Sequence, residues 1–483
     1  IIDIASFSNT LEKRKITLLC LWLAIIQSMI NKIQRMNRLA INGGKPVRAK
    51  TDLFPAYKPI GKEEEEAALR VVRSGALSKF IGAWDPAEPS FAEASEDRPQ
   101  FYGGPEVLGF EREWAEKFGV KHAVSMNSAT SGLIASLGAI GIEPGDEVIV
   151  SPYSMCISAT APLFWGAVPV FADIEPEYFC LDPQSVEKAI TPRTKAIIVV
   201  DLFGQSHDVE AINALAQKHN LKVIADSAQI PGGKYKSKYA GTLSDIGVYS
   251  LNFHKHIHTG EGSLVVTNDD VLAERLQLIR NHAEAVVEDK GVSNIVNMVG
   301  HNFRLTEIQA AIGREQLKKL DTLLEERIKN VVYIREHCQD MPGFRPAPER
   351  ADVSHVYYMQ AFLYDEKIVG VPRAKFFSAI KAELAPSKLQ EEEGVLMGQG
   401  YVKPIYMLPI FQKQIAFGSH GFPFRSEFYK GVARYDKGMC PVVERLHEKE
   451  LITNDLMRPG MQKSDLDDVV DAFHKVYEYR EEL

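Results

Sequence analysis

The feature that most constrains the fold is a series of short apolar runs, each of which ends in turn residues. These runs are GDEVIVSP, AVPVFADI, KAIIVVDLFG, KVIADSAQ and DIGVYSLN. Short β-branched runs of this kind are typical of strands buried on both faces of a parallel sheet. Amphipathic stretches such as VEAINALAQKH separate several of them and predict helices that cover the sheet. We therefore expect an α/β fold with functional residues at the C-terminal ends of its strands.

The chain of 483 residues is long enough for two domains. The α/β pattern occupies residues 36–301, whereas residues 302–483 begin with a long helical pattern and then become mixed. We expect a large domain with a mainly parallel sheet, followed by a smaller C-terminal α+β domain. An insertion at about residues 85–105 is rich in Pro, Gly and acidic residues. A loop of this length predicts a lid or a mobile segment, and we expect it to border the site and influence the choice of substrate.

Residues 1–35 have a different character from the rest of the chain. A basic start precedes an apolar run over residues 16–26, which is shorter than the ~20 residues that span a membrane comfortably. No small-residue cleavage site follows this run, and Met36 precedes a polar start, NRLAINGGKPVRAK. We interpret residues 1–35 as an extension outside the fold; a genuine anchor or targeting segment is the alternative.

Charge and cysteine content exclude several classes of function. The net charge of −8 is spread along the chain without a basic block, which argues against nucleic-acid binding. The five cysteines are odd in number, lie far apart and form no C-x-x-C pair. This argues against a disulfide framework and a zinc site, and favours the reducing cytoplasm.

One lysine lies among three histidines in the stretch SLNFHKHIHTGEGS, residues 250–263. The histidines, His254, His256 and His258, could bind a metal, or Lys255 could be a covalent catalyst. We expect no metal site, because no carboxylate or cysteine cluster completes one. A lone lysine usually pairs with a carboxylate or extends to solvent, so its companions must decide its role.

Two residues upstream of Lys255 favour a catalytic role for it. Asp226 ends the predicted strand KVIAD, and Gln229 follows it by three residues. A pyridoxal 5′-phosphate (PLP) enzyme needs a lysine that holds the aldehyde as a Schiff base and a carboxylate that keeps the pyridine nitrogen protonated. The amide of Gln229 could reach the 3-hydroxyl of the ring.

The stretch NSATSG, residues 127–132, could hold the phosphate of such a cofactor. It enters a predicted helix with small residues and hydroxyls, where free N–H groups and the helix dipole favour an anion. Ser250 could add a second hydroxyl. Each of these features alone is more often capping or turn chemistry. Their order along one α/β sheet, together with Lys255 and Asp226, favours PLP.

These motifs make the sequence recognisable. From about Met36 to the C-terminus, it resembles the DegT/DnrJ/EryC1/StrS family of PLP-dependent sugar aminotransferases. The resemblance rests on ordered stretches: NGGKPVR, FYGGPEVLGFE, NSATSGL, GDEVIVSPY, PVFADIEPE, ITPRTKAIIVVDLFGQ, IADSAQIPGG, DIGVYSLNFHKHIHTGEGS, GHNFRLTEIQAAIG and KPIYMLP. It implies a fold-type I, aspartate aminotransferase-like architecture. It also implies transfer of an amino group from glutamate or glutamine to a keto-sugar, nucleotide-linked or not, or to a keto-cyclitol.

The resemblance also implies roles for single residues. Lys255 matches the catalytic internal-aldimine lysine, Asp226 the partner of the pyridinium nitrogen, and Gln229 the residue at the 3-hydroxyl. Asn302, in HNFR, matches an asparagine that the neighbouring subunit sends to the phosphate, which implies a homodimer with shared active sites. The remaining phosphate contacts would be Ala129, Thr130 and Ser250.

The identity of the catalytic position favours one branch of the family. A dehydratase branch carries histidine where this chain has Lys255, so we expect a transaminase. The freed lysine amine would move a proton between the donor's α-carbon and C4′ of the cofactor, while Asp226 stabilises the protonated ring.

Two departures from the family pattern stand near the expected site. Where the family often has an aromatic residue stacked on the ring, this chain has Met155, with Tyr153 as a possible substitute. The family's GEGG is GEGS here. If that last glycine requires a positive φ, Ser263 would alter the loop.

The sequence gives less information about substrate-binding residues than about cofactor-binding residues. Arg304 and Tyr406 are candidates for binding a carboxylate or phosphate, but an ordinary salt bridge and a core tyrosine fit them as well. Glu261 is expected to hold the loop after the lysine by hydrogen bonds. Two other functions stay open: an aromatisation of the aminohydroxybenzoate type on the same scaffold, and a non-catalytic homologue. The second would have been favoured by loss of Lys255 or Asp226.

Overall fold

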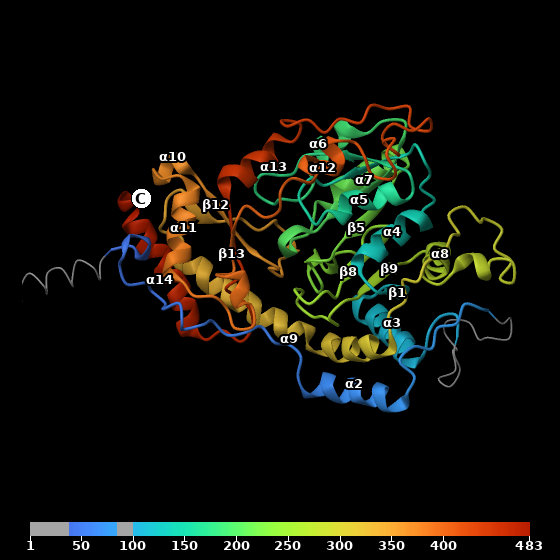
Figure 1. The fold of residues 1–483 in the computed structure, drawn as a ribbon, viewed down its shortest axis with the longest axis horizontal. Helices are drawn as coiled ribbons and strands as arrows, with labels where there is room; N and C mark the ends of the chain where they lie inside the picture. Colours follow the sequence, from blue (N-terminus) through green and yellow to red (C-terminus); the bar gives the residue numbers. More distant parts are fainter. Residues whose placement is uncertain (1–37, 85–99) are drawn as a thin grey trace, which may run out of the picture.

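The computed structural model describes residues 38–84 and 100–483. The predicted N-terminal extension, with its apolar run, and most of the 85–105 insertion lie outside the described residues. Figure 1 shows a large region built around one sheet and a smaller region around a second sheet, with a long helix running beneath both. Within the described ranges, no helix is long and apolar enough to cross a membrane.

The large sheet confirms the predicted α/β fold. In the described chain it has seven strands, and five consecutive strands, which run to one edge of the sheet, pair in parallel. The other two strands extend the sheet on the opposite side in antiparallel pairs. In spatial order the strands are β1 (His122–Met126), β9 (Ser263–Thr267), β8 (Ile246–Ser250), β5 (Lys222–Asp226), β4 (Thr194–Val200), β2 (Glu147–Val150) and β3 (Val168–Phe171).

Alternating side chains of these strands serve opposite faces of the sheet, because successive side chains of a strand point to opposite sides. Val148 and Ile198 pack in the core that contains α4 (Ala129–Ala139), α5 (Ile157–Phe164) and α8 (Asp270–Arg280). Their neighbours Ile149 and Ile197 pack instead with α6 (Pro183–Ala189) and α7 (Val209–His219). Burial on both faces explains why the runs are apolar throughout.

The second sheet is antiparallel and lies in the smaller region. Its strands, in order, are β10 (Phe344–Pro346), β12 (Gln360–Tyr364), β14 (Leu451–Asn454) and β13 (Met397–Gln399). Its core includes side chains from α11 (Arg373–Glu383), α14 (Lys463–Glu478) and the C-terminal part of α9 (Glu307–His337).

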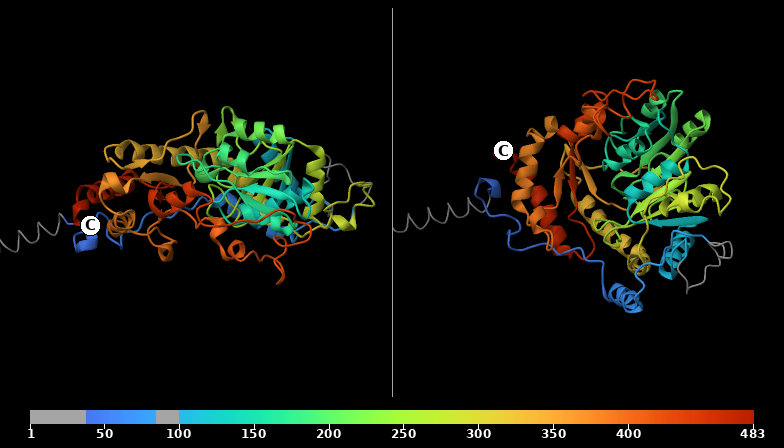
Figure 2. Two further views of the ribbon diagram at one scale, coloured as in Figure 1. Left: turned by 90° about the horizontal axis from the view of Figure 1, so that it is seen from above. Right: turned by 45° about the vertical axis from the view of Figure 1, so that its right-hand side comes forward.

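The start of the described chain packs on this smaller region. The short helix η1 (Ala40–Asn42) lies close to α11, and the side chain of Glu383 accepts hydrogen bonds from the N–H groups of Ala40, at 2.7 Å, and Val47, at 3.0 Å. Figure 2 shows this N-terminal segment beside the C-terminal helices. Residues far apart in sequence therefore complete one core.

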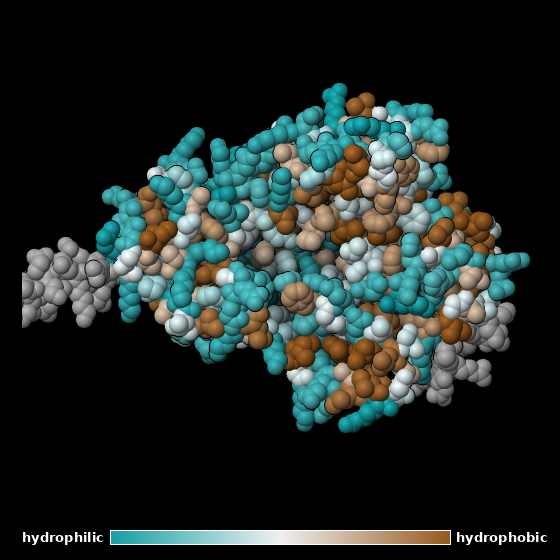
Figure 3. Space-filling model, in the orientation of Figure 1, coloured by the Kyte–Doolittle hydropathy of each residue, from teal (hydrophilic) through white to brown (hydrophobic). Residues whose placement is uncertain are grey.

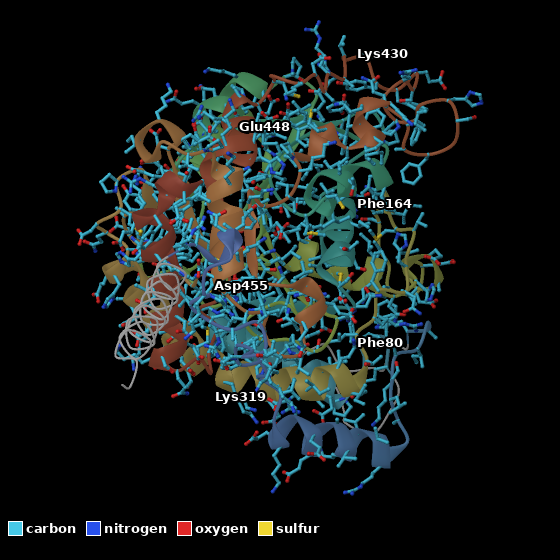
Figure 4. All side chains as sticks on the ribbon, turned by 60° about the vertical axis from the view of Figure 1, so that its left-hand side comes forward. Phe80, Phe164, Lys319, Lys430, Glu448 and Asp455 are labelled. Atoms are coloured by element: carbon cyan, nitrogen blue, oxygen red, sulfur yellow. The ribbon has the colours of Figure 1, made fainter. Side chains whose placement is uncertain are left out.

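Two segments contribute to both regions: the helix α9 and the chain after residue 401. α2 (Lys62–Ser74) and α3 (Pro105–Phe118) pack on α9, and Lys319 of α9, labelled in Figure 4, pairs with Glu64 at 2.7 Å. The chain after residue 401 also returns to the large core, where Tyr406, Phe411 and Tyr435 surround Phe171. Thus the two cores share the chain after residue 302, and a single boundary there remains a prediction.

The remaining elements are short. A three-stranded sheet contains β6 (Lys234–Tyr235), β7 (Lys238–Tyr239) and β11 (Val353–Ser354). The other short helices are η2 (Leu202–Gly204), η3 (Ala283–Ala285), α10 (Glu366–Val369), η4 (Glu391–Glu393), η5 (Ile405–Met407), α12 (Pro409–Gln412), α13 (Pro441–Arg445), η6 (Leu446–Glu450) and η7 (Arg480–Glu482).

Candidate active site

Lys255 lies in the loop that follows β8 and is buried. Only 7% of the residue is exposed, and its Nζ lies 4.2 Å from the centroid of the Tyr358 ring. Burial lowers the pKa of the Lys255 amine to about 8, and the nearby charge of Asp226 opposes this shift. The neutral amine that a nucleophile or proton carrier needs is therefore much more accessible near neutral pH than in an ordinary lysine.

Asp226 is the last residue of β5, the strand next to β8. Its carboxylate accepts hydrogen bonds from the hydroxyl of Ser158, at 2.6 Å, and from the N–H of Ala228, at 3.3 Å. Burial raises the pKa of Asp226, while the Ser158 hydrogen bond and the charge of Lys255 act in the opposite direction. Parallel neighbouring strands thus bring Asp226 and Lys255 to one edge of the sheet, as predicted.

Gln229 is held in one orientation. Its Oε1 accepts the N–H of Phe203 at 2.8 Å, so Nε2 must supply the donors, and Nε2 lies 3.2 Å from the hydroxyl of Tyr401. The carbonyl end is therefore occupied, and the amide presents N–H groups to an acceptor such as a ring hydroxyl oxygen.

The NSATSG stretch begins α4 as predicted. Ser128 is the N-cap, with its Oγ accepting the N–H of Ser131 at 3.1 Å, so that Ala129 and Thr130 form the first turn. The first N–H groups of a helix lack partners within the helix, and the dipole favours an anion there. Ser250 ends β8, is buried, and accepts the N–H of Asn252 through its Oγ at 3.3 Å.

Ser263 does not have the effect that the sequence suggested. It is the first residue of β9 and pairs with Met126 and Ser250, and the positive φ of this loop is at Gly260, at +82°. Its hydroxyl donates to the carbonyl of Ser128 at 2.9 Å. The expectation of an altered loop was wrong, because this position needs no left-handed backbone and the serine fastens β9 to the start of α4.

The loop after the lysine is held as expected. The side chain of Glu261 accepts a hydrogen bond from Nδ2 of Asn252 at 2.9 Å, and its carbonyl accepts from Gln309 of α9 at 2.8 Å. These bonds connect both ends of the loop around Lys255 with the long helix.

Asn302 and Arg304 lie beside the NSATSG stretch of the same chain. The N–H of Asn127 donates to the carbonyl of Phe303 at 2.8 Å, and Asn127 Nδ2 lies 3.3 Å from the carbonyl of Asn302. The side chain of Asn302 is exposed and accepts from Nε of Arg304 at 2.8 Å. Donation of Asn302 to a partner subunit remains a prediction.

The aromatic candidates are less available than the sequence suggested. Tyr153 is buried, and its hydroxyl accepts the N–H of Tyr401 at 2.7 Å, so it is fixed in the core. Tyr406 is fully buried, and its hydroxyl donates to Glu444, so this polar group is not free to bind a substrate. Met155, 54% exposed just before α5, is the candidate left to cover a ring.

The histidines around Lys255 have packing roles. His256 is buried with Nε2 at 2.9 Å from the carbonyl of Val356, and burial lowers its pKa well below the usual value. His258 Nδ1 accepts the N–H of Gly260 at 3.3 Å. In residues 38–84 and 100–483, no group of three or more His, Cys, Asp or Glu side chains could hold a metal ion.

A pocket of about 340 Å³ adjoins the lysine loop. Its wall includes Tyr358, on whose ring the Lys255 amine lies, and Tyr401, which contacts Gln229. The other polar residues of its wall are His254, Glu393, Thr453, Asp455 and Arg458. The sequence analysis did not identify Ser158, Tyr358 or Tyr401. Tyr401 lies two residues before the family-like stretch KPIYMLP, which is the one available signal among the three.

The donor set fits PLP: a buried lysine, a carboxylate on the adjacent strand, an oriented amide and the start of a helix. The family model for the DegT/DnrJ/EryC1/StrS aminotransferases matches residues 87–434. The chain belongs to this family.

Relatives of this aminotransferase are similar over much of its length. It is 31% identical to the L-glutamine:2-deoxy-scyllo-inosose aminotransferase of Streptoalloteichus tenebrarius, over 92% of this chain and 99% of the relative. It is 39% identical to the GDP-perosamine synthase of Caulobacter vibrioides, over 52% of this chain and 67% of the relative. Among solved structures, DesV of S. venezuelae, in complex with a ketimine intermediate, is 27% identical with a TM-score of 0.68, covering 86% of this chain and 94% of DesV.

Proposed function

We propose that this aminotransferase moves an amino group from glutamate or glutamine to a keto-sugar or keto-cyclitol, with PLP bound through Lys255. The observation that carries the proposal is the proximity of two buried groups: Lys255, with a pKa of about 8, in the loop after β8, and Asp226 at the end of the neighbouring strand β5. The relatives' names support both acceptor classes and, in one case, glutamine as donor.

Different residues of the chain would contact different parts of PLP. PLP, when bound, supplies an electron sink for the carbanion formed at the donor's α-carbon. Asp226 would pair with the pyridine nitrogen and keep it protonated. Gln229 would donate to the 3-hydroxyl oxygen, and the first turn of α4, with Ser250, would hold the phosphate.

Lys255 would both anchor the cofactor and carry a proton. Its amine would accept the proton from the donor's α-carbon and deliver one to C4′ of the cofactor. With the acceptor bound, the same amine would carry protons in the opposite direction. A pKa lowered to about 8 suits both directions, because the amine loses and regains a proton near neutral pH more easily than an ordinary lysine does.

The first experiment is an absorbance spectrum of protein loaded with PLP, followed by addition of glutamate or glutamine. We expect a visible band to fall while a near-ultraviolet band rises, and Lys255→Ala to abolish this exchange. A band that no amino donor alters would favour the aromatisation chemistry instead. No band at all would contradict both catalytic functions.

We also propose that the protein acts as a homodimer. Met155, Phe253 and Val299, in segments that flank the site, are large apolar side chains and each is more than half exposed, as is common at an interface. Figure 3 shows apolar patches on one face of the molecule, among them a patch over α2 and α9. The exposed loop with Val299 leads directly to Asn302, which fits the asparagine expected to reach a partner's phosphate.

A reducing compartment suits the cysteines. Cys156, Cys180, Cys338 and Cys440 are free thiols in the described chain. Because stable extracellular proteins usually pair such residues, we propose a cytoplasmic location.

A further inference from the structure

The pocket beside the lysine loop has a distinctive charge. Two carboxylates, Glu393 and Asp455, form part of its wall, and its cationic side chain is Arg458. Figure 4 labels Asp455, which follows β14, near the middle of the face shown. His254 also borders the pocket, but burial lowers its pKa, so it is mostly neutral at neutral pH.

The guanidinium of Arg458 already has hydrogen-bond partners within the protein. It is buried, bonds to Asp455 through Nη2 and to Gln390 through Nη1, and the Asp455 charge raises its pKa. Asp455 also lies 3.8 Å from Arg327. The pocket therefore offers carboxylate acceptors at its wall and no unpaired guanidinium for a polyanion, whose phosphates would face Glu393.

Two side chains of the pocket wall also touch groups of the candidate active site. Tyr358 contacts the Lys255 amine and Tyr401 contacts Gln229, and both rings form part of the pocket wall. The electron-rich face of an aromatic ring is a suitable surface for the polarised C–H groups of a sugar or cyclitol ring. A volume of about 340 Å³ is at the lower end for ligand sites, which suits a single ring.

We propose that this pocket binds the amino acceptor as a neutral polyhydroxylated ring, a keto-cyclitol or an unlinked keto-sugar, without a nucleoside diphosphate. Glu393 and Asp455 accept hydrogen bonds from ring hydroxyls, and the tyrosines hold the ring beside Lys255. This inference rests on the proposed aminotransferase function and names its acceptor class. It makes Glu393 a specificity-determining residue.

The test compares Glu393→Gln with Glu391→Gln in PLP-loaded, full-length protein. Both glutamates are exposed on the same short helix, η4, but only Glu393 is part of the pocket wall. Loss of a charge-assisted hydrogen bond should raise the KM for scyllo-inosose about five- to tenfold in Glu393→Gln. Glu391→Gln should match the parent protein, and UDP or GDP at millimolar concentration should not inhibit.

The donor half-reaction separates the two proposals. If the parent protein fails to exchange its amine with glutamate or glutamine, the aminotransferase proposal itself fails. If that exchange proceeds, three results would overturn the pocket assignment: equal KM values in the two variants, competitive inhibition by UDP or GDP, or turnover of a nucleoside-diphosphate keto-hexose in preference to scyllo-inosose.

Discussion

Buried charge at Lys255 has a measurable cost at the residue scale. The folded-state pKa of about 8 lies below the ordinary value of 10.5, so the unfolded chain binds more protons between these values. The free energy of unfolding therefore rises as the pH increases from about 8 to about 10.5. Below pH 8 the buried charge of Lys255 lowers it by the full amount. A shift of this size corresponds to about 3 kcal/mol.

Lys255→Met should accordingly stabilise the cofactor-free protein at pH 7. We expect the free energy of unfolding to rise by about 1–3 kcal/mol, because Met keeps much of the stem and removes the buried charge. Denaturant titration at pH 7 and pH 10 measures this, and the gain should shrink at the higher pH. Exposed Lys62 provides a matched control, and a gain of similar size in Lys62→Met would contradict the explanation.

Single residues were predictable where chemistry fixes the residue type. An aspartate at the end of one strand and a lysine in the loop after the adjacent strand are unusual enough to be found from the sequence. Ser158 and Tyr401 were not, because a serine or tyrosine has many ordinary uses. Their contacts, to Asp226 and Gln229, join positions 68 and 172 residues apart, and no local pattern encodes such pairs.

At the element scale, the start of α4 contains a helix cap at the place proposed to hold the phosphate. Ser128 caps the helix through the N–H of Ser131, and its carbonyl accepts from Ser263 of β9. Aspartate is as good a cap as serine, but its charge would repel a phosphate at the same N–H groups. Two substitutions can therefore separate stability from cofactor binding.

Ser128→Ala should lower the free energy of unfolding by about 1 kcal/mol through the lost cap. Ser128→Asp should retain the parent's stability yet weaken PLP binding at least tenfold. Thermal melting of cofactor-free protein and fluorescence titration with PLP provide the two measurements. If Ser128→Asp bound PLP as tightly as the parent protein, the phosphate would have to lie elsewhere.

Strands were easier to predict than the segments between them. Double-sided burial makes each parallel strand a continuous apolar run, which is visible in the sequence. By contrast, the stretch from residue 401 to about 446 contains little regular structure, yet Tyr406, Phe411 and Tyr435 pack against Phe171 of β3. Without periodicity, its return to the large core could not be predicted.

The whole molecule shows where sequence reasoning ends. The order of motifs indicated the architecture, but the interleaving of the two cores depends on long-range packing. α9 contacts α2 and α3 near one end and α14 near the other, so one helix ties the regions together. The wall of the pocket accordingly combines His254 of the lysine loop with Met397 and Thr453 of the second sheet.

Assembly is the last property of the whole molecule that can be tested. If the loop before Asn302 reaches a partner, Ile295, which is 63% exposed, should lie at or near the interface. Ile295→Asp should then convert a dimer into monomers in analytical ultracentrifugation and weaken PLP binding, because a charge in an apolar interface is costly. Ile368, 58% exposed on α10, is the matched control, and Ile368→Asp should leave both unchanged. A parent protein that is monomeric yet binds PLP tightly would show that the site is complete within one chain, and Asn302 would then act beside Asn127 of its own subunit.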